Sequence, residues 1–161
     1  MIEMALKNVQ ETEIMLISFL SGMIVTGIEI SASRLLAPYF GTSLLVWTNV
    51  IGVVLISLSA GYYVGGKLSE KNLGFDFVYK IILLAGFSYA ISPIVISPIL
   101  KITIPFFGLF SISKIIIFES LLFSIILFSL PIFILGMINP FLIKIATFKQ
   151  ERVGLNDRLI I

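Results

Sequence analysis

The chain has 161 residues, of which 58% are hydrophobic and only 12% are charged, with a mean hydropathy of +1.13 and a formal net charge of +2. Soluble domains carry about 25% charged residues, so this chain has too few charges to cover a surface in water, and we expect lipid to cover it instead. The small net charge gives no reason to expect nucleic acid as a partner. The absence of Cys and His excludes disulfides, thiolate nucleophiles, imidazole bases and the usual zinc ligands, so we expect no metal and no cofactor.

Four apolar stretches are each long enough to cross a bilayer, which takes roughly 20 residues at a rise of 1.5 Å per residue. They cover residues 14–36, 44–66, 77–99 and 115–138. The sequence therefore predicts an all-α polytopic membrane bundle of about four transmembrane helices over residues 14–143. Polar tails are expected on either side of it, at 1–13 and 144–161.

The first span is too long to be a secretory signal peptide, whose apolar stretch has about 7–15 residues. We interpret it as a retained transmembrane helix. Pro38, Tyr39 and Gly41 follow it and predict a tight turn before the second span.

The second and third spans are joined by the polar loop Gly66–Asn72. Pro93 and Pro98 are expected to kink or fray the far end of the third span, because proline removes a helical hydrogen bond. Residues 101–114 are apolar but too short to cross the bilayer, so we expect an interfacial or re-entrant segment. A bundle of five helices is the main alternative.

The basic residues are distributed unequally between the two sides of the predicted bundle. With the N-terminus inside, eight of the eleven Lys and Arg residues fall on inner segments. Because cytoplasmic segments of membrane proteins are enriched in Lys and Arg, we expect a multi-pass protein of the cell membrane with both termini cytoplasmic. The inner eight are Lys7, Lys67, Lys71, Lys80, Lys144, Lys149, Arg152 and Arg158, and the outer three are Arg34, Lys101 and Lys114.

Glu29 lies within the first span, where a carboxylate costs about 2.5–3.5 kcal/mol on insertion scales unless it faces a partner or water. At 100° per residue, Glu29 shares a face about 80° wide with other small or polar residues. The others are Ser18, Gly22, Thr26 and Ser33. We expect this face to lie against another helix or a wet cavity rather than against lipid.

Three further polar residues fall in the same outer half of the predicted bundle as Glu29. They are Arg34 near the outer end of the first span, Asn49 about one turn into the second, and Glu119 at the start of the fourth. One interpretation is an intramembrane polar site open to the outer side, whose carboxylates hold a cation or a proton. The alternative is structural: an ion pair of Arg34 with Glu119, and a second carboxylate kept neutral by burial.

Small residues predict where the helices pack. Ser57, Gly61 and Gly65 repeat at four-residue intervals on the second span, and such spacing lets a neighbouring backbone approach closely. Gly22 on the first span is a further candidate packing residue. The second span also has a polar or small opposite face, so we expect it to be contacted on two sides. That face carries Asn49, Gly52, Ser59 and Tyr63.

Proline also marks candidate hinges in the fourth span. Pro131 interrupts it, and the pair Asn139-Pro140 closes it. A proline inside a helix removes one hydrogen bond and bends the axis, so these three residues are candidate hinges, with a purely structural kink as the alternative.

Two blocks of sequence are specific enough to suggest a family. Residues 28–41 read IEISASRLLAPYFG and are followed by Val46-Trp47 and by GYYVGGKL at 61–68; a second block, LGMINPF, stands at 135–141. These blocks resemble the membrane portion of the spermidine synthase-like integral membrane proteins, of the fused major-facilitator/spermidine synthase type. The resemblance implies a bundle like half of a major-facilitator transporter.

The resemblance also implies a partner. In that family, transmembrane helices are joined to a soluble aminopropyltransferase-like domain that binds decarboxylated S-adenosylmethionine. This sequence shows no strand followed by a Gly-rich turn and an acidic residue, so we expect no enzyme activity from it despite the family's name. We expect instead a non-catalytic module that anchors, or partners, a separately encoded soluble aminopropyltransferase-like protein.

Two other functions remain open at this point. The chain could be a transporter-like bundle that oligomerises to pass a small cationic solute such as a polyamine, using Glu29 and Glu119. It could also be a truncated remnant of the family without independent activity. The expected partners are therefore the lipid bilayer and either further copies of the chain or the soluble protein.

Overall fold

The computed structural model describes residues 2–70, 75–107 and 112–147. Four helices follow one another along the chain: α1 (Ile2–Phe40), α2 (Leu44–Ser69), α3 (Phe75–Phe107) and α4 (Ile112–Gly136). After the single turn residue Met137, residues 138–147 continue α4 as a further helical segment. The described ranges contain no strand, so the prediction of an all-α bundle is confirmed.

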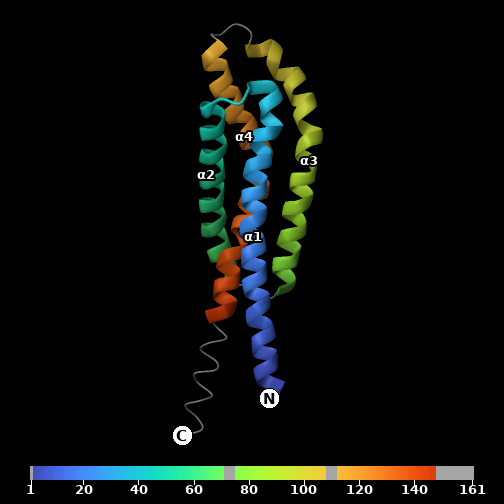
Figure 1. The fold of residues 1–161 in the computed structure, drawn as a ribbon, viewed down its shortest axis with the longest axis vertical. Helices are drawn as coiled ribbons and strands as arrows, with labels where there is room; N and C mark the ends of the chain where they lie inside the picture. The colour runs from blue at the N-terminus through green and yellow to red at the C-terminus, as the bar shows by residue number, and fades with distance from the viewer. Residues whose placement is uncertain (1, 71–74, 108–111, 148–161) are drawn as a thin grey trace.

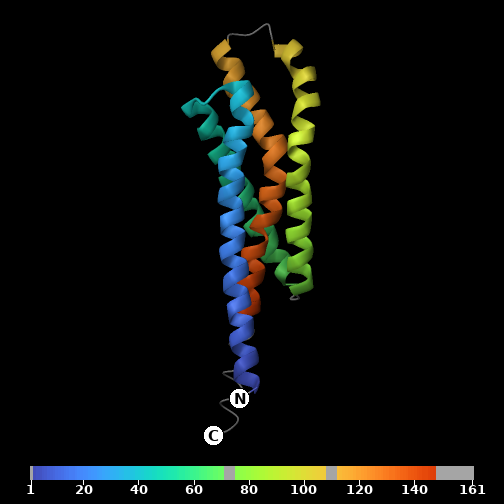
Figure 2. The ribbon, with the colours of Figure 1, turned by 45° about the vertical axis from the view of Figure 1, so that its right-hand side comes forward.

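Four stretches of these helices are long and apolar enough to cross a membrane, which is the predicted number. They are Thr12–Phe40, Leu44–Ser69, Phe75–Val95 and Ile117–Thr147. Figures 1 and 2 show an elongated bundle in which α1 begins and α4 finishes at the same end. We call this the terminal end, and we call the opposite end, where residues 41–43 connect α1 to α2, the loop end.

The first helix is longer than the expected span. α1 begins at Ile2, so residues 2–13, expected as a polar tail, are helical. Ala, Leu, Met, Gln, Glu and Lys are common in this segment and favour helix, which lets the span extend through them. At its other end Pro38 remains within α1. The turn begins at Gly41, whose φ of +76° suits glycine, and its N–H donates to the carbonyl oxygen of Ala37 at 2.9 Å.

The third helix also continues past its prolines. α3 runs through Pro93 and Pro98 to Phe107, so the first half of the segment expected to be interfacial or re-entrant continues the helix. Proline is tolerated in this way in membrane helices, because neighbouring groups satisfy the freed backbone carbonyl. The rest of that expectation falls partly on residues 108–111, which lie outside the described ranges, as do 71–74 of the predicted polar loop and 148–161 of the predicted tail.

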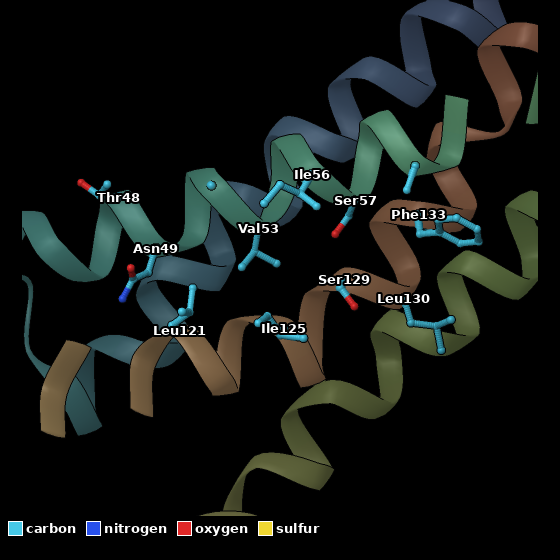
Figure 3. A pocket seen from close by; sticks show the side chains of 12 residues that line it. Thr48, Asn49, Val53, Ile56, Ser57, Leu121, Ile125, Ser129, Leu130 and Phe133 are labelled. Atoms are coloured by element: carbon cyan, nitrogen blue, oxygen red, sulfur yellow. The ribbon is translucent and has the colours of Figure 1, made fainter. Parts of the chain in front are cut away.

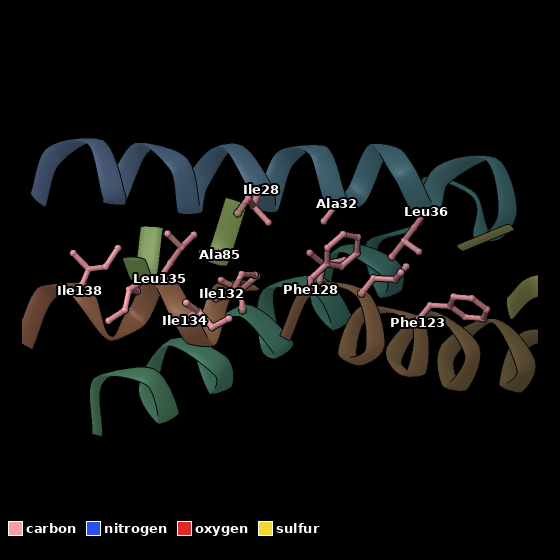
Figure 4. Packing of buried hydrophobic residues seen from close by; sticks show 14 of the residues in the cluster. Ile28, Ala32, Leu36, Ala85, Phe123, Phe128, Ile132, Ile134, Leu135 and Ile138 are labelled. Carbon is pink, nitrogen blue, oxygen red and sulfur yellow. The ribbon is translucent and has the colours of Figure 1, made fainter. Parts of the chain in front are cut away.

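α4 is the central helix of the bundle. It packs against each of the other three helices, and 56% of the residues in its most apolar stretch are buried, compared with 11% for α1. Figure 4 shows the α1 side of this core, where Ile28, Ala32 and Leu36 point toward α4 from successive turns. Their partners on α4 and its continuation include Phe123, Phe128, Ile132, Leu135 and Ile138.

α2 and α4 come very close together near the terminal end. A Cβ atom added to Gly61 would overlap the carbonyl oxygen of Phe133 and lie 3.0 Å from the Cα of Gly136. A Cβ added to Gly65 would lie 2.6 Å from the Cα of Met137. The missing side chains of the glycines therefore set the distance between these two helices.

The interruption of α4 at Met137 has a local cause in Pro140. Proline has no N–H to donate to the carbonyl of Gly136, four residues earlier, and in a regular helix its ring would collide with that carbonyl. The N–H of Met137 donates instead to the carbonyl oxygen of Ile134 at 3.2 Å, which tightens the chain into a single turn. The helix then resumes. Pro131, by contrast, is buried within α4 and does not end it.

Adding one methyl group at the α2–α4 contact should destabilise the protein. We expect Gly61→Ala and Gly65→Ala each to lower the free energy of unfolding by about 1–3 kcal/mol, the cost of overpacking a core. The new Cβ would strike backbone atoms, which cannot rotate away as a flexible side chain can. Unfolding in mixed detergent–lipid micelles measures the change.

The matched control is Gly66→Ala on the same helix, where a new Cβ would have no neighbour within 4 Å. This variant should be neutral or more stable, because Ala favours helix over Gly. Equal stability of the Gly61→Ala and Gly66→Ala proteins would contradict the close contact.

Candidate functional site

Asn49 connects α2 to α4 at the loop end. Its Nδ2 donates to the carbonyl oxygen of Ile117 at 2.9 Å and to the hydroxyl oxygen of Ser120 at 2.8 Å. Ser120 is completely buried, and its hydroxyl in turn donates to the carbonyl of Ile117 at 3.2 Å. Both amide hydrogens of Asn49 are thus used to hold two helices together. Sequence reasoning singled out Asn49 but missed Ser120, which only the relative placement of the two helices identifies.

Glu119 and Arg34 do not form the ion pair that was the structural alternative. Glu119 is buried, with 7% of its surface exposed, while Arg34 is exposed on α1. Neither side chain has an ion pair or hydrogen bond with any residue in the described part of the chain. Glu119 is therefore a mostly buried residue whose carboxyl group pairs with no described residue, and Arg34 projects from the bundle where it can reach the membrane interface.

The polar face of α1 lies at the edge of its packed side rather than at its centre. Ser33 is buried, Ser18 and Glu29 are half-buried, and Gly22 and Thr26 are exposed. The hydroxyls of Thr26 and Ser33 donate to carbonyls of their own helix, at 3.1 and 2.8 Å. Glu29 has no ion pair or hydrogen bond within the described residues. The polar face of α1, Glu119 and Arg34 therefore do not come together in one site.

Two of the candidate packing and hinge residues border a small cavity between α1, α2 and α4. Its volume is about 80 Å³, and Gly22 and Asn139 are among the residues that line it. A Cβ on Gly22 would have no neighbour within 4 Å, so Gly22 makes no close helix contact inside this chain. Gly61 and Gly65, and the buried Ser57 one turn before them, lie on the side of α2 that faces α4.

A hydrogen bond between side chains also joins α1 to α3. The hydroxyl groups of Ser31 and Tyr89 bond to each other across the two helices. Together with the Asn49 contacts, this bond means that polar side chains within the spans connect both α1 and α2 to other helices.

A long apolar groove separates α2 from α4 on one side of the bundle (Figure 3). It has a volume of about 590 Å³ and extends from Asn49 near the loop end to Phe133 near the glycine contact. Glu29, Arg34 and Glu119 do not line it. Its α2 side includes Asn49, Gly52 and Ser57, and its α4 side includes Ile125, Ser129 and Phe133. The polar and small face of α2 noted in the sequence was the signal that could have located it.

Neither of the two cavities contains a group of side chains suited to metal binding, and the described residues as a whole contain no cluster of three or more acidic, Cys or His residues. No family model, curated protein or solved structure matches this chain.

Removing the Asn49 amide should loosen α2 from α4. We expect Asn49→Leu to lower the free energy of unfolding by about 0.6–2 kcal/mol, the range for interhelical hydrogen bonds in membranes. In a double-mutant cycle with Ser120→Ala, the two substitutions should be non-additive because they remove the same bond.

Thr48→Val serves as the control, since the Thr48 hydroxyl donates to the carbonyl of Leu44 in its own helix at 2.9 Å. It should change stability little and show no coupling to Ser120→Ala. Additive effects of Asn49→Leu and Ser120→Ala would mean that this bond does not contribute to holding α2 against α4.

Proposed function

We propose that this chain is a non-catalytic integral membrane module that anchors a separately encoded soluble aminopropyltransferase-like protein at the cytoplasmic side of the cell membrane. The observation that carries the proposal is the use of polar side chains within the spans. Asn49 bonds to α4, and Ser31 bonds to Tyr89 of α3. These side chains hold helices in place, which suits a rigid support for another protein.

The distribution of charge supports the side on which the partner would lie. Lys67 at the end of α2, Lys80 near the start of α3 and Lys144 near the end of the α4 continuation all belong to the terminal end (Figure 1). Nζ of Lys67 lies 4.4 Å from the centre of the Tyr63 ring, in a cation–π contact. Cytoplasmic ends of membrane helices are enriched in Lys, so we assign the terminal end to the cytoplasm.

We infer the kind of partner from the sequence blocks at 28–41 and 135–141, which resemble the membrane portion of the spermidine synthase-like family. Both blocks belong to helices of the packed core. A soluble aminopropyltransferase-like protein is therefore the partner that we expect.

The anchoring role predicts where such a soluble protein is found. When the aminopropyltransferase-like protein of the same genome is produced together with this chain, we expect it in the membrane fraction, and without this chain in the soluble fraction. Purified chain in vesicles should transfer no aminopropyl group from decarboxylated S-adenosylmethionine to a polyamine. Identical fractionation with and without the chain, or transfer by the chain alone, would overturn the proposal.

Transport is the second candidate, and the half-buried Glu29 on the polar face of α1 is the feature that favours it. Under the anchoring proposal, vesicles containing the chain should show no polyamine flux above that of empty vesicles. A flux that Glu29→Gln abolishes, and that Glu13→Gln at the exposed start of the same span leaves intact, would establish transport instead.

A further inference from the structure

The groove between α2 and α4 is lined by a hydroxyl group that has no hydrogen-bond partner. Ser57 is only 6% exposed and lines the groove, yet it forms no hydrogen bond with any described residue. Ser129, on the opposite wall, is likewise without one. Most other serines of these two helices bond to their own backbone: Ser59 donates to Leu55 at 2.8 Å, for example.

An unpaired hydroxyl is costly in hydrocarbon, where no water can replace the missing partner. Acyl chains that fill the groove would offer Ser57 and Ser129 no hydrogen-bond partner outside their own helices. The occupant that stabilises this groove most therefore brings its own hydrogen-bonding groups to the same depth in the membrane.

The shape of the groove suits a helix. From Asn49 to Ala60 its α2 wall covers twelve residues and roughly 17 Å at 1.5 Å rise per residue, which is about three helical turns. At Gly52 there is open space where a Cβ would stand. Small residues on a wall of this kind let a neighbouring backbone approach closely.

We propose that this groove is the contact surface for a second copy of the chain, with the serines of each copy bonding to the other. A hydroxyl group is both donor and acceptor, so Ser57 and Ser129 complement an identical surface. The groove lining carries no charged residue, so two copies bring no like charges together. A two-fold axis along the bilayer normal keeps both copies in the same orientation, as a shared cytoplasmic end requires.

This contact goes beyond the proposed anchoring function and does not depend on it, because the groove lies between two spans and not at the cytoplasmic end. A dimer that fails to form would leave the fractionation result unchanged. Failure of the anchoring test would likewise leave the dimer intact.

The absence of cysteine from the chain makes a direct test available. Ile56→Cys places a thiol in the groove, and Leu83→Cys places one on α3; both positions are 73% exposed in the monomer. Under mild oxidation of the full chain in lipid vesicles, we expect a disulfide-linked dimer for Ile56→Cys and little for Leu83→Cys. Equal cross-linking of the two, or none for Ile56→Cys, overturns the proposal.

The serines provide the second measurement. With full-length chains carrying donor and acceptor dyes, energy transfer is followed as the vesicles are diluted with lipid. The variant with both Ser57→Ala and Ser129→Ala should dimerise about threefold or more weakly, as expected for lost interhelical hydrogen bonds. The Ser59→Ala control should match the parent. A parent that stays monomeric at every ratio of protein to lipid would mean that lipid fills the groove. Equal dimerisation of the parent and the double variant would mean that the serines do not form the contact. Either result contradicts the proposal.

Discussion

Helices in a bilayer gain little from hiding apolar side chains from each other, because lipid tails are equally apolar; close packing and interhelical hydrogen bonds must hold them together instead. In this protein both act on one pair of helices. Gly61 and Gly65 of α2 meet the backbone of α4 around Gly136 and Met137 near the terminal end. Asn49 fastens α2 to α4 at the loop end. The positions of α1 and α3 also depend on α4, because it packs against both of them.

The position of the groove follows from these two attachments. They lie twelve residues apart along α2, at Asn49 and Gly61, and between them the helices leave a volume of about 590 Å³. Because the glycine contact is tight and Asn49 uses both of its amide hydrogens, α2 cannot easily close the groove by moving toward α4. The groove is therefore a fixed feature of the bundle, and its unpaired serines stay accessible to the proposed second copy.

Composition and hydropathy were enough to predict an all-α bundle with four membrane-crossing helices. A chain with so few charges is expected in lipid, where a helix satisfies the backbone hydrogen bonds within its own segment. The helix ends were less accessible. Pro38 was expected to lie in a turn but remains inside α1, and α3 continues past Pro93 and Pro98 to Phe107. A helix is interrupted only at Met137, three residues before Pro140, in the part of the chain that the structure describes.

The candidate site was harder to predict than the fold. Periodicity placed Glu29, Thr26 and Ser33 on one face of α1, but it could not show which neighbour that face meets. It gave no means of finding that Asn49 contacts Ile117 and Ser120, since those bonds depend on how α2 and α4 are placed relative to each other. The serine–glycine repeat on α2 was informative because a small-residue stripe has few uses other than close helix contact.

The close α2–α4 contact is the claim on which the rest depends, and solid-state NMR of the unmodified chain in bilayers tests it without any substitution. With glycine Cα atoms labelled with ¹³C, the structure predicts a cross-peak between Gly61 and Gly136. It predicts no cross-peak between Gly66 and a glycine of α4, because the Cβ position of Gly66 has no neighbour within 4 Å on another helix. Absence of the Gly61–Gly136 cross-peak, in spectra where contacts between the adjacent Gly65 and Gly66 are clearly seen, would contradict the account.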